Sequence, residues 1–400
     1  MGKTPKNVDL LQQLMDNIAD NIFFKDSDSK FIMINKANAG WFGLDDPREV
    51  VGMDDFDFFK KEHALRQVEE EQWIMETGKP VIAEEQATSR DDDGFTGWGS
   101  VTKMPLCDKG GNIIGTMGIG RDISELKNKE LQLKKANDQI AEDLQMAAKL
   151  QQAFLPHGYP SFNDAKGRSP IKFFHLYEAD TELGGDFCSV YRLSDTKAGL
   201  LICDVMGHGV RAALITAIIH GTAEELVRNA ESPGDFLTAM NQRLLPVLQT
   251  EDEYLFATAA YFTIDVISGE LTGAIAGHPL PFLIQPQQGK VTQLTVAEEA
   301  VGPALAIVAD YAYESIRVQL HPGDEMLLYT DGICEAMNIS QDEFGEEHLR
   351  ETILEYNKLP LKGLIPRIVE VVQEYTDSKK LGDDICLLGF SLNALPTDSQ

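Results

Sequence analysis

The alternation of apolar and polar positions in residues 8–122 predicts a small domain of helices and antiparallel strands. An amphipathic helix, LLQQLMDNIAD, comes first. Two apolar runs, IFFKD and FIMIN, then flank the polar turn SDSK, which indicates a hairpin. After a helical stretch, EEEQWIMETGK, two alternating runs, WGSVTKMPL and NIIGTMGIGRD, are joined by CDKGG, and such turn residues predict a second hairpin.

Residues 123–156 have a helical pattern throughout. From Ile123 to Phe154 the chain contains neither Gly nor Pro, and Pro156 ends the helix because its ring cannot continue the backbone ladder. Counting by sevens gives an unbroken apolar row: Leu126, Leu133, Ile140, Ala147 and Phe154. The companion row is mixed and includes Asn137, which on a seam favours paired helices in one register. We expect a parallel homodimer through the PAS domain and this coiled-coil linker; the alternative for the linker is a single helix lying on its own domain.

Beyond Pro156 the pattern alternates apolar strands with two evident helices, and in four places an acidic motif stands at the end of a strand. The motifs are ELGGDF at 182–187, CDVMGHG at 203–209, YTDGICEA at 329–336 and LGDDICLL at 381–388. Carboxylates at the ends of neighbouring strands can converge although they are far apart in the sequence. The run VRAALITAIIHGTAEELV follows the second motif directly and predicts a core helix, so a shift of this helix would move the Asp204 loop.

Converging aspartates imply divalent cations, because several like charges are unfavourable in a dry site unless a cation compensates them. All-oxygen ligands with retained water suit Mg²⁺ or Mn²⁺, whereas zinc prefers histidine and thiolate. Glycines beside each acid allow tight turns and let a backbone carbonyl approach the metal. One DG or GD pair is usually only a turn, but four such motifs in this order predict a metal site.

The amino-acid composition restricts the classes of partner and the compartment that we expect for this protein. The chain has 35 Lys+Arg against 64 Asp+Glu, a formal charge of −29, and it has no long basic run, which argues against nucleic acid and anionic lipid as partners. It has no apolar stretch of about 18 residues and no apolar signal-peptide centre, so we expect a cytoplasmic protein without a membrane span. The five cysteines are scattered without a CxxC pair, and we interpret them as buried apolar side chains.

The first segment resembles a PAS sensor domain in its opening, IADNIFFKDSDSKFIMINKA, and in its ending, IIGTMGIGRDISELK. This resemblance implies a cup of antiparallel sheet whose helices can close over a ligand. The alternative is that side chains fill the cup and the domain only dimerises. His63 is the one histidine here that can be considered for a haem, and we interpret it as a surface residue of a helix. The ligand of the domain stays open.

The region from about 146 to 392 resembles the serine/threonine phosphatase domain of the stage II sporulation protein E type, within the PPM superfamily. The resemblance rests on MAAKLQQAFLP, GGDF, DVMGHG, AGHPLP, TDGICEA and GDDI. It implies two antiparallel sheets packed together with helices on the outer faces, an α/β/β/α sandwich. We therefore expect an α+β protein with a PAS domain at 8–122, a coiled-coil linker at 123–156 and a phosphatase domain at 157–392.

The resemblance also implies the site residues. The implied metal ligands are Asp186, Asp204, Val205, Asp331, Asp383 and Asp384, and the implied catalytic side chains are Asp186, Asp204, Asp331 and Asp383. Asp204 is expected to bridge two ions, Val205 to bind through its carbonyl, and Asp383 rather than Asp384 to complete the second ion's site. Relatives often carry Gly in place of Val205 and a hydroxyl residue in place of Cys386, so the second difference removes a hydroxyl.

Two such ions activate a shared water and neutralise charge on the phosphoryl oxygens, so no protein nucleophile is needed. His208 is interpreted as packing at a helix start rather than as an acid, and His278 as a positional or substrate-rim residue. We expect a sensor-controlled, Mn²⁺/Mg²⁺-dependent phosphatase for phosphoserine or phosphothreonine, and the resemblance implies a phosphorylated anti-sigma-factor antagonist as substrate. The main alternative is a catalytically silent scaffold; a phosphodiesterase or nucleotide cyclase would need nucleotide-binding elements that the sequence lacks.

Overall fold

The computed structural model describes residues 7–89, 96–163, 169–249, 254–295, 297, 300–378 and 382–393. The chain divides into two compact units, one ending at Gln139 and the other beginning at Ile140. Both units combine helices with antiparallel sheet, so the expected α+β class is confirmed. In the described parts of the chain, no helix combines the length and the apolar character that crossing a bilayer requires.

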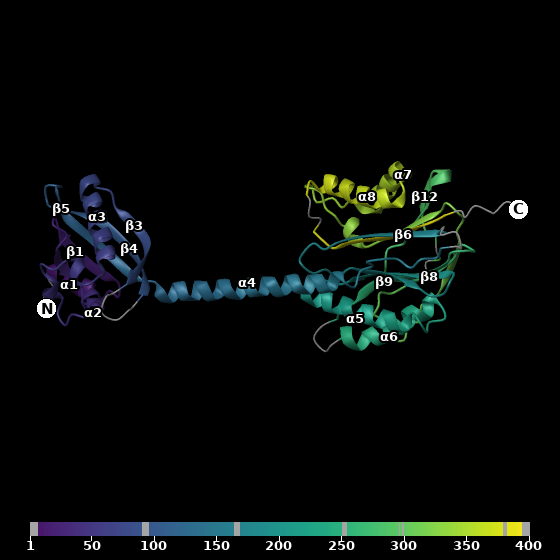
Figure 1. Ribbon diagram of the computed structural model, residues 1–400, viewed down its shortest axis with the longest axis horizontal. Helices are drawn as coiled ribbons and strands as arrows, with labels where there is room; N and C mark the ends of the chain where they lie inside the picture. Colours follow the sequence, from purple (N-terminus) through teal and green to yellow (C-terminus); the bar gives the residue numbers. More distant parts are fainter. Residues whose placement is uncertain are drawn as a thin grey trace, which may run out of the picture. The chain divides into compact units, whose positions relative to one another are not determined.

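The first unit is built on one five-stranded sheet with the order β2-β1-β5-β4-β3 (Figure 1). Its elements are α1 (Asn7–Asn17), β1 (Asn21–Asp26), β2 (Phe31–Ile34), α2 (Lys36–Phe42), η1 (Pro47–Val50), η2 (Asp55–Asp57), α3 (Lys61–Thr77), β3 (Val81–Ser89), β4 (Thr96–Cys107) and β5 (Ile113–Asp122). Both predicted hairpins are confirmed, since β1 pairs with β2 and β4 with β5, each antiparallel. The turn carboxylates fix them: Asp26 accepts hydrogen bonds from the amides of Asp28 and Lys30, and Asp108 from those of Gly110 and Asn112.

The predicted long helix is α4 (Ser124–Gln152), which begins where the Asp122 carboxylate accepts a hydrogen bond from the Ser124 amide. Three members of its apolar row, which repeats every seven residues, are strongly exposed: the exposed fractions of Leu126, Leu133 and Ile140 are 62%, 64% and 56%. The helix is confirmed, while its pairing with a second copy stays a prediction.

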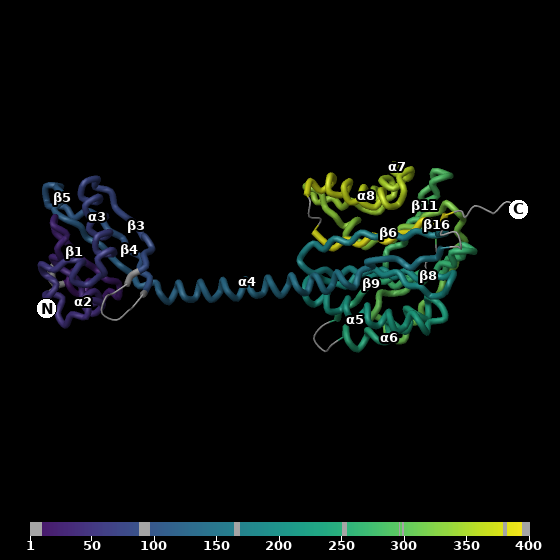
Figure 2. The backbone as a smooth tube through the Cα atoms, viewed as in Figure 1, coloured from purple at the N-terminus to yellow at the C-terminus, as the bar shows by residue number. Residues whose placement is uncertain are grey.

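The second unit is a sandwich of two sheets with helices on the outer faces (Figure 1). One sheet has the order β13-β10-β9-β8-β7, with β14 paired to β10, and the other has the order β12-β11-β15-β16-β6. The strands are β6 (Ile171–Glu178), β7 (Phe187–Arg192), β8 (Lys197–Val205), β9 (Ala257–Asp265), β10 (Glu270–Ala276), β11 (Phe282–Gln285), β12 (Lys290–Gln293), β13 (Val301–Gly302), β14 (Ile316–Gln319), β15 (Glu325–Tyr329) and β16 (Ile385–Leu392). Figure 2 traces β6 beside β16, its antiparallel partner, although more than 200 residues separate them in the chain.

Two helices cover each outer face of the sandwich. They are α5 (Val210–Leu226) and α6 (Pro233–Leu248) on the first sheet, and α7 (Gly345–Tyr356) and α8 (Leu361–Thr376) on the second, with short turns η3 (Pro286–Gln288) and η5 (Asp331–Ile333). The prediction of a helix after the second acidic motif is confirmed by α5. The expectation of two evident helices in this part was wrong, since the described residues contain four.

The middle strand β8 shows why its sequence is continuously apolar. Leu200 and Ile202 belong to the core between the two sheets, whereas Leu201 and Cys203 pack into the core under α5 and α6. Successive side chains of a strand point to opposite faces, so a strand between two cores must be apolar at every position. The polar exceptions are Lys197, at the exposed start of the strand, and Asp204, next to its last residue.

The cysteines only partly match their interpretation as buried side chains. Cys188, Cys203 and Cys386 are buried, Cys334 is half-buried and Cys107 is exposed. Cys107 is the last residue of β4, beside the hairpin turn, where the sheet offers no cover. The interpretation was therefore wrong for Cys107.

Candidate active site

The acidic motifs meet where the ends of the two sheets adjoin. Asp186 precedes β7 and Asp204 lies near the end of β8, so antiparallel pairing of these strands brings the two acids to one edge. Asp331 follows β15 and Asp383 precedes β16, which brings them to one edge of the second sheet in the same way. The hydroxyl of Thr330, just after β15, donates to Asp186 Oδ2 at 2.6 Å and joins the two edges.

Burial and mutual repulsion control the charge of this site. Burial, followed by the charge of Asp204, raises the pKa of Asp186 well above its usual range. Burial also raises the pKa of Asp204 to about 7, and the charges of Asp331 and Asp383 add to this effect. The principal influences on these groups include no lysine or arginine. A bound cation would supply the counter-charge that these carboxylates lack, and an all-carboxylate donor set fits Mg²⁺ or Mn²⁺.

The two neighbouring acids before β16 differ in their contacts. Asp384 is buried, and its carboxylate accepts hydrogen bonds from the Gly185 amide at 2.5 Å and the Asp180 amide at 2.9 Å. It thus links the start of β16 to residues 184–186, which we call the GGD loop. Asp383 is exposed, and one of its oxygens accepts a hydrogen bond from the Asp384 amide at 2.7 Å.

Glycine is required around these acids because backbones pass very close to one another. A Cβ on Gly185 would lie 2.6 Å from the carbonyl oxygen of Val205, and a Cβ on Gly332 would lie 2.1 Å from that of Asp384. Real Cβ atoms do not approach an oxygen that closely, so each contact needs glycine. The side chain of Val205 is buried in the core under α5, while its carbonyl faces the GGD loop.

Gln151, near the end of α4, is a site residue that the sequence analysis did not single out. Its Nε2 donates to the Gly184 carbonyl at 2.7 Å and to the Thr216 hydroxyl at 3.1 Å, and its Oε1 accepts a hydrogen bond from the Gly184 amide at 3.2 Å. Gly184 lies two residues before Asp186, and Thr216 lies on α5. The available signal was its place within MAAKLQQAFLP, a segment that resembles the start of the family's domain.

Thr330 and Glu335 were also missed, although both lie in the YTDGICEA motif. The Thr330 hydroxyl accepts a hydrogen bond from the Cys386 amide at 2.8 Å while it donates to Asp186. The side chain of Cys386 belongs to the core between the sheets, so its backbone rather than its side chain serves the site. Burial and the charges of Asp331 and Asp383 raise the pKa of Glu335, so this exposed carboxyl is within electrostatic range of the cluster.

The two histidines of the motifs have different environments. His208 is exposed in the loop before α5. His278 is buried, and its Nδ1 lies 2.8 Å from the hydroxyl of Thr258, the residue opposite Asp204 in the β8–β9 register. Burial lowers the pKa of His278 to about 3, so the ring is neutral at pH 7. His278 is therefore buried against β9, the strand that pairs with the Asp204 strand, which agrees with the positional interpretation rather than with a place at the rim.

The carboxylates interact electrostatically without forming a complete set of metal ligands. Within the part of the chain that the structure describes, no three His, Cys, Asp or Glu side chains are arranged to hold a metal ion by themselves. This arrangement remains compatible with Mg²⁺, because that ion keeps several waters and is usually bound through one or two carboxylates. The donor chemistry thus fits the ion, and the individual ligand assignments remain predictions.

Comparison with known families agrees with this architecture. Residues 194–393 match the stage II sporulation protein E (SpoIIE) family, and residues 15–128 match the PAS fold. The chain belongs to the SpoIIE family. Its N-terminal unit is a PAS domain, and its C-terminal unit is the SpoIIE-family domain.

Relatives of this SpoIIE-family protein include two phosphatases of Bacillus subtilis. Phosphoserine phosphatase RsbP is 27% identical over 247 residues, which are 62% of this chain but only 57% of RsbP. Phosphoserine phosphatase RsbU is 24% identical over 257 residues, covering 64% of this chain and 72% of RsbU. The SiaA-PP2C domain of Pseudomonas aeruginosa has the same fold, with a TM-score of 0.55 and 22% identity over 64% of this chain and 99% of that domain.

Proposed function

We propose that this protein is a sensor-regulated, Mn²⁺/Mg²⁺-dependent phosphatase that hydrolyses phosphoserine or phosphothreonine in a protein. The observation that carries the proposal is the cluster of Asp186, Asp204, Asp331 and Asp383, which lacks a protein cation among its principal electrostatic influences. Family membership and the phosphoserine phosphatases RsbP and RsbU support it.

The contacts of each acid suggest its role. We assign Asp186 and Asp204 as ligands from the first sheet, with Asp204 between two ions, and Asp331 and Asp383 as ligands from the second sheet. We favour Asp383 because it is exposed, whereas both oxygens of Asp384 already accept backbone hydrogen bonds. The Val205 carbonyl joins this set, and Asp384 supports it. Divalent ions in such a site supply activation of a water and neutralisation of phosphoryl charge.

The substrate that we propose is a phosphorylated anti-sigma-factor antagonist, in keeping with the family resemblance. The chain carries a formal charge of −29, so recognition of such a partner must rest on local complementarity near the site rather than on the overall charge. The cytoplasm is the compartment in which such a substrate would be met.

The linker supports a proposed homodimer. Leu126, Leu133 and Ile140 repeat at intervals of seven residues, and all three are more than half exposed. A second copy of α4 would cover this row in a parallel coiled coil and would leave Asn137 facing its twin. We retain the division into a PAS sensor domain at 8–122, a linker at 123–156 and a phosphatase domain at 157–392.

The deciding experiment is phosphate release from a phosphoserine peptide by the full-length protein with and without Mn²⁺. Asp204→Ala should lose at least 100-fold in kcat/KM, because it removes the central carboxylate of the cluster. Asp195→Ala, at an exposed position in the turn after β7, is a matched control and should retain full activity. Absence of Mn²⁺-dependent turnover by the wild-type protein would favour the silent scaffold instead.

A further inference from the structure

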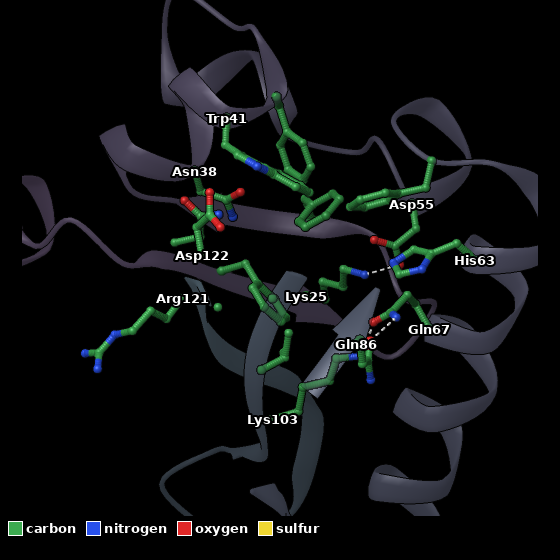
Figure 3. Close-up of a pocket in the computed structure, with 18 of the residues that line it drawn as sticks. Lys25, Asn38, Trp41, Asp55, His63, Gln67, Gln86, Lys103, Arg121 and Asp122 are labelled. Carbon is green, nitrogen blue, oxygen red and sulfur yellow. Dashed lines mark hydrogen bonds and ion pairs between the residues drawn. The ribbon is translucent and has the colours of Figure 1, made fainter. Parts of the chain in front are cut away.

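The PAS domain contains a cavity of about 80 Å³ between the sheet, α2 and α3 (Figure 3). Since a buried water needs about 10–15 Å³ on this measure, the cavity has room for roughly five to eight waters or a single-ring molecule. Side chains therefore do not fill the cup. Aromatic rings form much of its wall, among them Phe31, Trp41, Phe42, Phe59 and Trp98.

Buried charged groups also line the cavity, and Lys25 Nζ lies over the Phe31 ring, 4.5 Å from its centroid. Lys25 Nζ donates to Glu71 Oε1 at 2.7 Å and also pairs with Asp55. Lys103 Nζ donates to Gln67 Oε1 at 2.6 Å and lies 3.3 Å from Glu70. Lys25 and Lys103 are only 2% and 1% exposed. Two ammonium groups therefore face three carboxyls, and the wall is neutral when Glu71, whose pKa burial raises, carries a proton. A ligand with a net charge would then lack a counter-ion there.

One atom of this wall lacks a partner. Glu71 is fully buried and lines the cavity, and its Oε2 has no hydrogen bond to any described residue. Buried polar atoms are nearly always satisfied, so this oxygen must obtain its partner from a water or a ligand in the cavity. Burial also raises the pKa of Glu71. Either protonation state of this carboxyl can bond to a ligand that presents a donor next to an acceptor.

His63 also lines the cavity, so the interpretation of His63 as a surface residue was wrong. It lies on α3, half-buried, and it lines the cavity with its ring 4.7 Å from that of Phe59. Burial lowers the pKa of His63, which favours its neutral form. The side chain therefore contributes another neutral ring to the cavity rather than a charge.

We propose that the PAS cavity binds a small, neutral, planar molecule of roughly six to eight non-hydrogen atoms that carries an N–H or O–H donor beside an acceptor. The donor would satisfy Glu71 Oε2, the acceptor would take a hydrogen bond from Lys25 or Lys103, and the ring would lie against the aromatic wall. Lactams and hydroxylated nitrogen heterocycles belong to this class. Apolar rings and charged rings of the same size do not.

Tryptophan fluorescence of the full-length protein gives a direct test, because Trp41 and Trp98, two of the three tryptophans, line the cavity. The probes are 2-pyridone, which is neutral with adjacent donor and acceptor, and three planar rings that also have seven or eight non-hydrogen atoms: toluene, the anion 2-furoate and the cation N-methylpyridinium. We expect saturable binding of 2-pyridone with a Kd on the order of 1 mM or below, and at least tenfold weaker binding of the other three. Equal binding of toluene or of a charged ring, or no binding of 2-pyridone, would overturn the proposal.

A cavity-filling variant locates the binding. Gly120 lines the cavity, and a Cβ added there would meet its nearest atom at 3.8 Å, so Gly120→Val fits the backbone and occupies ligand space. It should weaken 2-pyridone binding at least tenfold. Ile119→Val, on the next residue of β5 and the opposite face of the sheet, is the matched control and should bind normally. Unchanged binding by Gly120→Val, with an unfolding profile like that of the control, would place the probe elsewhere.

Discussion

Replacing Gln151 by alanine should disable the phosphatase site although Gln151 is not one of its acids. The side chain is only 7% exposed and makes three hydrogen bonds, two to the backbone of Gly184 and one to Thr216. Alanine would leave the amide and carbonyl of Gly184 without these partners. Each buried polar group left unpaired costs about 1–3 kcal/mol.

The expected effect is smaller than the sum of these losses, because an open pocket lined by Gln151 and Gln152 lets water reach part of the gap. We therefore expect about 2–3 kcal/mol, which corresponds to a roughly 30- to 160-fold shift toward a displaced GGD loop. The displaced loop would carry Asp186 away from Asp204, so kcat/KM should fall by a similar factor.

The assay is Mn²⁺-dependent hydrolysis of p-nitrophenyl phosphate by full-length protein, together with the midpoint of thermal unfolding. Gln152→Ala is the matched control, since it removes the same side chain from the exposed neighbouring position of the same helix. Its activity should equal that of the wild type. If Gln151→Ala lowers the midpoint but retains the kcat/KM of Gln152→Ala, the amide stabilises the domain without positioning the loop, and the reasoning fails.

Three further outcomes are expected. Thr330→Val keeps the shape of the side chain but removes the hydroxyl that joins Asp186 to the Cys386 amide, so phosphatase activity should fall at least tenfold. Thr330→Ser keeps the hydroxyl and should retain most of the activity. Equal activities of the two variants would contradict this prediction. Chelation with EDTA should lower the midpoint of thermal unfolding, and added Mn²⁺ should restore it. Asp204→Asn should raise the midpoint of the metal-free protein by a few degrees, because it relieves repulsion among the carboxylates. Calorimetry measures both effects. Leu133→Asp should convert the dimer to a monomer in light scattering, and Gln132→Asp, also exposed on α4, should leave it dimeric.

Local chemistry explains which elements could be predicted from the sequence. The two hairpins of the PAS domain were predictable because Asp26 and Asp108 hold their turns through hydrogen bonds within four residues. Strand β3 was not, because VIAEEQATS carries mostly polar residues and pairs only with β4 at the edge of the sheet. An edge strand lacks the apolar signal that burial imposes on a central strand such as β8.

The residues of the candidate active site also fall into two groups, those with a local signal in the sequence and those without one. Its aspartates have a local signal in the sequence. Asp186, Asp331 and Asp383 each stand next to a glycine, Asp204 is followed by Gly207, and all four lie near one end of an apolar run. Gln151 and Thr330 carry no such signal, because their bonds to Gly184 and Asp186 join residues 33 and 144 positions apart. Partners of that kind are fixed by the packing of the finished fold and have no local pattern in the chain.

The contacts of Gln151 also limit how a signal in the linker can reach the acids. One amide holds the end of α4 to the GGD loop and to α5, and α5 begins five residues after Val205. Phe154 reinforces the junction, since its ring stacks on His220 of α5 with 4.9 Å between centroids. A shift of the last turn of α4 must therefore break these contacts or carry α5 with it. A difference of 1–3 kcal/mol at such a junction changes the equilibrium between two positions of α4 by about 5- to 150-fold. Control of the acids would therefore not require a more extended chain of contacts through the phosphatase domain.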